Sequence, residues 1–277
     1  MEQAGSCKSG IRAHFQSDVN ESNSDAIPAA PSLPPPLLSR EEPWNGWWTL
    51  LWAVLLFLVW QTVMTAGLAI AAFQQGALKD LADFAEAVES LAFDGDVLGV
   101  IAFATLFIIC PLCWFLGRLR PGFSGWSYLG NRSVAWWHWP LWGVATVACS
   151  VVFGAVAPSL GVDGPDDSMV AMASSTEFPL LLFLGVGIGA PLVEEFIFRG
   201  ALWRGWRASR MGLVGTLLLT SLLWAVLHVQ YPTVIMAYIF VLGLLLGWAR
   251  EKTGNLWVPV SMHMLNNSLA TVQMLQA

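Results

Sequence analysis

The chain has 277 residues, of which 56% are apolar and 12% are charged, and its formal net charge at pH 7 is −6. Soluble domains carry roughly 45–50% apolar and about 25% charged residues, so this composition excludes an ordinary soluble protein. Because no basic patch suited to nucleic acid is present, we expect the lipid bilayer to be the main surrounding and no nucleic acid to bind.

The first 46 residues differ in kind from the rest of the chain. They are rich in Ser, Pro, Asp and Asn and show no periodic apolar face. Such a segment buries too little apolar surface to offset the entropy lost on ordering. We therefore predict a disordered tail over residues 1–46.

Long apolar stretches recur after this tail, and each is about the 20 residues that a helix needs to cross a ~30 Å hydrocarbon layer. We predict an all-α fold, a polytopic transmembrane helix bundle of about seven spans, or eight if one further helix is present. Residues 47–160 would hold the N-terminal spans and 178–275 a second transmembrane domain. The predicted spans are 47–73, 97–117, 136–159, 178–203, 212–229, 233–249 and 255–275.

The connection after the first span contains apolar residues at helix spacing, from Leu78 to Ala92, with acidic residues on the other face. This pattern is too polar to span a bilayer. It is typical of a helix that lies in the membrane interface, which we predict near 77–92.

Lys and Arg alternate between connections, which predicts orientation because cytoplasmic loops are enriched in them. We expect an integral protein of the plasma membrane with its N-terminus in the cytoplasm. Tryptophans also gather at span ends, where interfacial anchors are found. They are Trp47, Trp48, Trp136, Trp137, Trp203, Trp206, Trp248 and Trp257.

The predicted span 178–203 carries three charged residues, Glu194, Glu195 and Arg199. Each charge at the bilayer centre costs roughly 2.5–3.5 kcal/mol, so the three must face a polar cavity or one another. Glu195 and Arg199 are four residues apart, which allows an ion pair on one helix face. The side chain of Glu194 lies about 100° around the helix from that of Glu195, so it can contact a different partner. A buried ion pair that only fixes packing is the alternative reading, and it leaves Glu194 unexplained.

Two later spans carry the remaining polar candidates. His228 ends the span 212–229, whereas His263 and Asn267 lie on one face of the last span. Buried polar groups need partners, so we predict that these residues converge with the two glutamates at one site.

Three motifs on successive apolar helices carry a family resemblance. They read Glu-Glu-x-x-x-Arg, aromatic-x-x-x-His and His-x-x-x-Asn, with Trp224 as the aromatic residue where Phe is more frequent. Together they resemble the type II CAAX prenyl endopeptidase and bacteriocin-processing (CPBP) family of intramembrane proteases, over about residues 178–275. The resemblance implies an endopeptidase that acts on a peptide or membrane-protein substrate.

The resemblance also implies roles for the polar residues. Glu194 would be the general base for a water that His228 helps to hold. His263 and Asn267 would stabilise the oxyanion, and Glu195 with Arg199 would orient these groups. We expect no cofactor.

Two alternatives use the same residues. Glutamates and histidines could bind zinc in a metalloprotease, although the chain has no His-Glu-x-x-His motif. Intramembrane ionisable residues also line ion pathways, so a transporter or a non-enzymatic scaffold is the third reading.

Glycines mark sites of close helix approach. Gly185, Gly187 and Gly189 precede the glutamate pair, and Gly243 and Gly247 lie one turn apart in a later span. We expect both groups to serve packing, although the first could also let a substrate come near.

Overall fold

The structure is a computed structural model, and it describes residues 42–76 and 80–276. All the elements in these ranges are helical, which confirms the all-α fold. The tail predicted over 1–46 lies, up to residue 41, outside the described residues. The α-helices are α1 (Gly46–Gln74), α2 (Leu81–Leu91), α3 (Gly95–Arg118), α4 (Gly125–Leu129), α5 (His138–Val156), α6 (Asp167–Ser175), α7 (Pro179–Leu182), α8 (Ala190–Glu195), α9 (Trp203–Ala208), α10 (Gly212–Val226), α11 (Thr233–Thr253) and α12 (Trp257–Gln276).

Three segments with other helical geometries complete the order. A 3-10 turn, η1 (Ala157–Leu160), continues α5, and two π-helical segments, η2 (Phe183–Gly189) and η3 (Phe196–Ala201), flank α8. As a result, α7 to α9 form one continuous helical segment over Pro179–Ala208.

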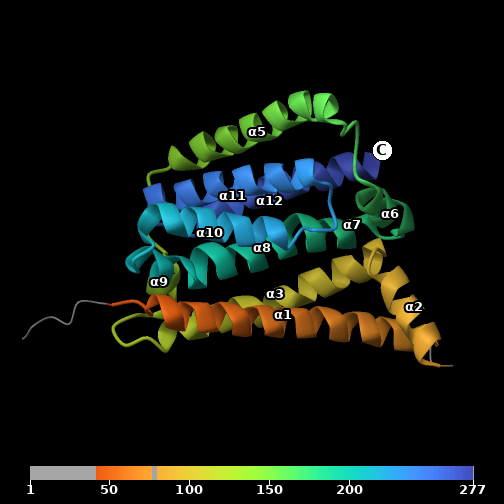
Figure 1. The fold of residues 1–277 in the computed structure, drawn as a ribbon, viewed down its shortest axis with the longest axis horizontal. Helices are drawn as coiled ribbons and strands as arrows, with labels where there is room; N and C mark the ends of the chain where they lie inside the picture. Colours follow the sequence, from red (N-terminus) through yellow and green to blue (C-terminus); the bar gives the residue numbers. More distant parts are fainter. Residues whose placement is uncertain (1–41, 77–79, 277) are drawn as a thin grey trace, which may run out of the picture. The chain divides into compact units, whose positions relative to one another are not determined.

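The bundle is built to cross a membrane several times. The long helices run between its two ends, with the connections gathered at those ends (Figure 1). Among the described residues, five helices are long and apolar enough to span: Gly46–Gln74, Gly95–Arg118, His138–Leu160, Pro179–Ala208 and Thr233–Thr253. The predicted spans 212–229 and 255–275 correspond to α10, with 15 residues, and α12, with 20. A polytopic bundle is thus confirmed, and a total of seven spans stays a prediction.

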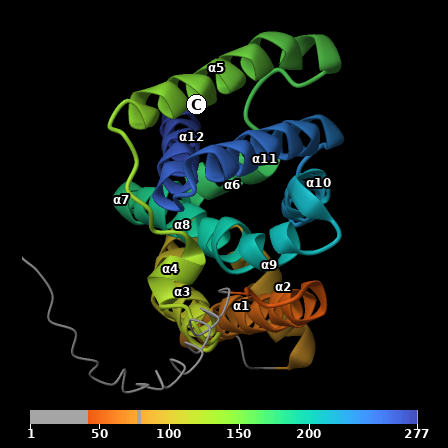
Figure 2. The same cartoon turned by 90° about the vertical axis from the view of Figure 1, so that its left-hand side faces the viewer.

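The segment Pro179–Ala208 occupies the centre of the bundle. Its most apolar window is 56% buried, against 6% for α1. Figure 2 shows α8 between α3 on one side and α11 and α12 on the other. The chain therefore places its three intramembrane charges on the helix that is best shielded from lipid.

Glycines allow α3 and the central segment to approach closely. A Cβ added at Gly185 would lie inside van der Waals contact with the backbone oxygen of Gly99, and one at Gly189 would lie 3.1 Å from Ala102 O. In α11, a Cβ at Gly243 would lie 2.9 Å from Ser221 Cβ in α10. These glycines serve packing, as predicted: Gly185 and Gly189 face the backbone of α3, and Gly243 faces the Ser221 side chain.

Gly187 differs from Gly185, although both lie in η2. A Cβ at Gly187 would meet its nearest neighbour, Ser268 Oγ, at 3.4 Å, an ordinary contact. We expect Gly185→Ala to destabilise by about 1–3 kcal/mol through overpacking, and Gly187→Ala to change stability little. Thermal unfolding of the two purified variants in detergent checks this, and equal melting temperatures would contradict the close approach to α3.

The tryptophans at helix ends divide into two groups. Trp47 and Trp136 are 82% and 79% exposed, in keeping with interfacial anchors. Trp203 and Trp206 are only 3% and 2% exposed, so the prediction that they anchor the interface is wrong. They belong to the central segment, where neighbouring helices cover its end.

Candidate functional site

The glutamates lie where the central helix changes its winding. α8 is a short α-helical stretch that ends at Glu195, and a π-helical segment lies on each side of it. In those segments the hydrogen bonds span five residues, as from Leu202 N to Ile197 O at 3.0 Å. π-Helical insertions are rare and frequent at functional sites. Glu194 and Glu195, at the end of α8, are both buried, with 6% and 0% exposure.

Glu195 and Arg199 form the ion pair that their spacing predicts. Arg199 Nη1 lies 2.7 Å from Glu195 Oε1, and both side chains are fully buried. Arg199 Nη2 donates to Gly243 O at 2.9 Å, so the same guanidinium also ties the central segment to α11. This pair fixes the carboxylate of Glu195 and leaves Glu194 outside it.

His263 lies between the two carboxylates. Its Nδ1 is 3.1 Å from Glu195 Oε1, and its Nε2 is 3.8 Å from Glu194 Oε2. Because a carboxylate bonded to Arg199 accepts hydrogen bonds, Nδ1 is the nitrogen that carries the proton in neutral His263. The second distance exceeds a hydrogen bond, so Nε2 faces Glu194 without bonding to it.

Trp224 forms the hydrogen bond that holds Glu194. Its Nε1 donates to Glu194 Oε2 at 2.5 Å, and its ring meets that of His263 edge to face with centroids 4.8 Å apart. The sequence identified Trp224 only as the aromatic residue of a motif and did not predict its contact with Glu194. The available signal was its position four residues before His228, which places both on one face of the helix.

His228 is joined to the site through Trp224. Its Nδ1 lies 2.8 Å from Trp224 O, a carbonyl that can only accept, so Nδ1 donates and Nε2 keeps its lone pair. The ring stacks against Tyr231, with centroids 6.1 Å apart. Burial raises the pKa of Tyr231, whose hydroxyl therefore remains neutral near pH 7.

Asn267 is oriented by two neighbours. Its Nδ2 donates to Val186 O at 3.1 Å, and its Oδ1 accepts from Asn266 Nδ2 at 3.2 Å. Asn266 is fixed in turn because its Oδ1 accepts from Tyr238 Oη at 2.5 Å. The amide nitrogen of Asn267 has a second hydrogen, which is available to a ligand.

A cavity of about 700 Å³ brings these groups to one space. It is lined by Trp224, His228, His263 and Asn267, together with residues of α5, α11 and the α5–α6 connection. Glu194 is not among the lining residues and lies behind this wall, bonded to Trp224. The structure thus brings Glu194, Glu195, Arg199 and His263 into contact. His228 is joined to them through Trp224, and Asn267 lines the same cavity as His263.

Comparison with known proteins gives one family. Residues 176–269 match the model of the type II CAAX prenyl endopeptidase Rce1-like family. This segment is an Rce1-like domain. It contains all six residues that the sequence singled out, and it confirms the resemblance to the CPBP family.

The match of this chain to a curated protein is slightly shorter. An uncharacterized 24.3 kDa protein of Escherichia coli is 37% identical over 87 residues, which is 31% of this chain and 40% of that protein. The aligned part therefore spans about two fifths of that relative's length. No solved structure matches the chain.

The Rce1-like domain does not present a set of zinc ligands. Among the described residues, no group of three or more His, Cys, Asp or Glu side chains is placed to hold a metal ion. His263 directs its Nδ1 at Glu195, while Arg199 and Trp224 direct hydrogen-bond donors at the glutamate oxygens. The glutamate oxygens that accept these hydrogen bonds are less available to a zinc ion, which binds through ligand lone pairs.

Proposed function

We propose that the chain is an intramembrane endopeptidase that hydrolyses peptide bonds with a water activated by Glu194. The observation that carries the proposal is a buried carboxylate outside the ion pair, held by Trp224 Nε1 and next to His263, two residues that line a cavity of about 700 Å³. Cavities of roughly 300–1,000 Å³ are typical of ligand sites, and this one is large enough to receive a peptide segment.

Glu194 supplies the base. Its Oε2 accepts from Trp224, which leaves Oε1 to take a proton from water as the water oxygen attacks the scissile carbonyl carbon. The carbonyl π electrons move to the oxygen and form an oxyanion. When the carbonyl re-forms, the C–N bond breaks and protonated Glu194 returns its proton to the leaving nitrogen.

Asn267 stabilises the oxyanion through its free amide hydrogen, and His263 does so in the form that carries a proton on Nε2 as well as on Nδ1. Asn267 has one amide hydrogen beyond its bond to Val186 O and lines the cavity one helical turn from His263. Donors that are held in place before the reaction stabilise developing charge without reorganising. His228, whose Nε2 keeps its lone pair, accepts a hydrogen bond from the water or from the substrate amide.

Glu195 and Arg199 act as positioning residues. Glu195 Oε1 fixes the proton on His263 Nδ1, and Arg199 fixes Glu195. Neither residue lines the cavity. Their contribution is to hold the imidazole in one orientation and tautomer.

The substrate is a peptide or a membrane protein, with a CAAX-type prenylated peptide or a bacteriocin-like precursor as the candidate classes. The apolar walls from α5, α11 and α12 suit a substrate that arrives from the lipid phase. We place the protein in the plasma membrane with its N-terminus in the cytoplasm.

Cleavage of labelled peptides by the purified full chain in detergent tests this function. The panel holds matched prenylated and plain peptides, each with and without a chelator. We expect cleavage that the chelator leaves unchanged. Loss of cleavage that added zinc restores would replace the water-only mechanism with a metalloprotease, and a chain that cleaves no peptide in the panel would favour the transporter or scaffold reading.

A further inference from the structure

A second cavity lies at the end of the bundle away from α6. It has a volume of about 430 Å³ and lies between α9, the last turn of α11 and the segment before α1. Nine of the described residues line it; four of these are arginines, Arg132, Arg204, Arg207 and Arg250, and one, Glu251, is acidic. The proposed peptidase activity uses none of these residues.

The lining keeps a positive charge after its own ion pair is counted. Arg207 and Glu251 neutralise each other through three contacts of 2.8–3.1 Å. Leaving Arg204 aside, Arg132 and Arg250 still give two positive charges, and the described residues of the lining include no acid besides Glu251. The cavity therefore favours an anion over a neutral molecule.

The arginines are fixed by backbone carbonyl groups. Arg250 is 4% exposed and donates to Arg199 O at 2.8 Å and to Leu129 O at 3.0 Å. Arg204 donates to Tyr128 O at 2.9 Å and to Ser127 O at 2.7 Å. Carbonyl oxygens orient the guanidinium of Arg250 but do not cancel its charge, so this side chain is held in place at little entropic cost on binding.

Glycines make room for two of these side chains. Gly130 has φ of +92°, and its Cα lies directly against the Arg250 guanidinium, where a Cβ would clash. Gly254 has φ of +63°, and the stem of Arg132 packs over it. The left-handed backbone at both positions favours glycine, so the local fold is built around the arginines.

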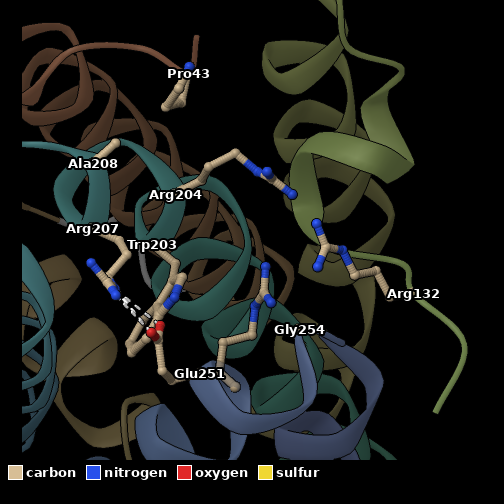
Figure 3. Close-up of a pocket in the computed structure, with 9 residues that line it drawn as sticks. Pro43, Arg132, Trp203, Arg204, Arg207, Ala208, Glu251 and Gly254 are labelled. Carbon is tan, nitrogen blue, oxygen red and sulfur yellow. Dashed lines mark hydrogen bonds and ion pairs between the residues drawn. The ribbon is translucent and has the colours of Figure 1, made fainter. Parts of the chain in front are cut away.

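The guanidinium groups of Arg132 and Arg204 point toward one another across the cavity (Figure 3). They come from different segments, Arg132 from the connection before α5 and Arg204 from α9. Arginine forks match phosphate oxygens in geometry.

We propose that this cavity binds a phosphate-bearing anion, with the headgroup phosphate of an anionic lipid and a soluble phosphate ester as its two sources. Its place at the end of a membrane-spanning bundle, where arginines of several connections gather, favours the lipid headgroup. Basic pockets between spans at the cytoplasmic side commonly bind such headgroups.

Native mass spectrometry of the full chain in detergent tests the site. The probes are dioleoylphosphatidylglycerol, dioleoylphosphatidylcholine and glycerol 3-phosphate. We expect retention of the phosphatidylglycerol, with a Kd about fivefold weaker for Arg132→Gln, since one arginine near a charged headgroup contributes about 1 kcal/mol. Retention of glycerol 3-phosphate with equal strength would identify a soluble phosphate ester as the ligand.

Matched variants at other positions test the proposal even if an arginine variant folds poorly. Ala208 is exposed and lines the cavity, so Ala208→Glu adds an acid there and Ala208→Gln adds the same bulk without charge. Of these two variants, only Ala208→Glu should weaken the binding of phosphatidylglycerol. Arg210→Gln, which removes a charge from an exposed arginine outside the lining, should leave binding unchanged. Equal loss in Arg210→Gln and Arg132→Gln, or no preference for phosphatidylglycerol over phosphatidylcholine, would overturn the proposal.

Discussion

Glu194→Gln is expected to lower the rate of peptide cleavage by about 10²–10⁴-fold, the range that a general base contributes. Glutamine keeps the shape of the side chain, and its amide oxygen can still accept from Trp224 Nε1. It cannot take a proton from water at neutral pH. The fold should therefore persist while the activity is lost, which separates this variant from a packing mutant.

The matched control is Glu177→Gln, the same change at an exposed glutamate before α7. We expect parent-like cleavage and an unchanged melting temperature for this variant. Steady-state kinetics of the parent and both variants on one cleaved peptide measure the effect. Similar kcat/KM values for Glu194→Gln and the parent would mean that another group activates the water.

The sequence was sufficient to predict the contacts that lie within one helix. The Glu195–Arg199 pair follows from a spacing of four residues, and the structure confirms it at 2.7 Å. The convergence of Glu195 with His263 could be expected from the cost of leaving buried polar groups unpartnered. Which nitrogen of His263 meets which carboxylate could not, because this depends on how α12 is rotated against α8.

The hydrogen bond from Trp224 to Glu194 could not be predicted from the sequence. The two residues are 30 positions apart, and the π-helical segments around α8 change the direction in which Glu194 points. Nothing in the local composition marks those segments. The contact therefore arises from the packing of whole helices.

The sequence also did not show which helices lie at the centre of the bundle, because lipid is as apolar as a protein interior. α1 and the segment Pro179–Ala208 have nearly the same hydropathy, 2.0 and 1.9, yet their apolar windows are 6% and 56% buried. The same ambiguity explains the wrong prediction for Trp203 and Trp206. Only the charged residues of the central segment indicated that it is shielded.

The ion pair of the central segment should be a large contributor to stability when one partner alone is removed. Arg199→Met leaves the Glu195 carboxylate buried, with its Oε2 already lacking a hydrogen-bond partner. Breaking a buried pair in this way costs about 3–5 kcal/mol. Arg207→Met breaks an ion pair of similar length, 2.8 Å, whose side chains are 42% and 23% exposed. There we expect a loss of less than about 1 kcal/mol.

The double variant Arg199→Met, Glu195→Gln distinguishes an unpaired charge from lost packing. Replacing both members removes the buried charge, so the double variant should recover much of the stability that Arg199→Met loses. Reversible unfolding of the purified protein in mixed detergent micelles, followed by tryptophan fluorescence, gives the free energies for the cycle. Additive losses would show that Arg199 stabilises the bundle through its bond to Gly243 O and its packing against Trp224, with Glu195 as a bystander.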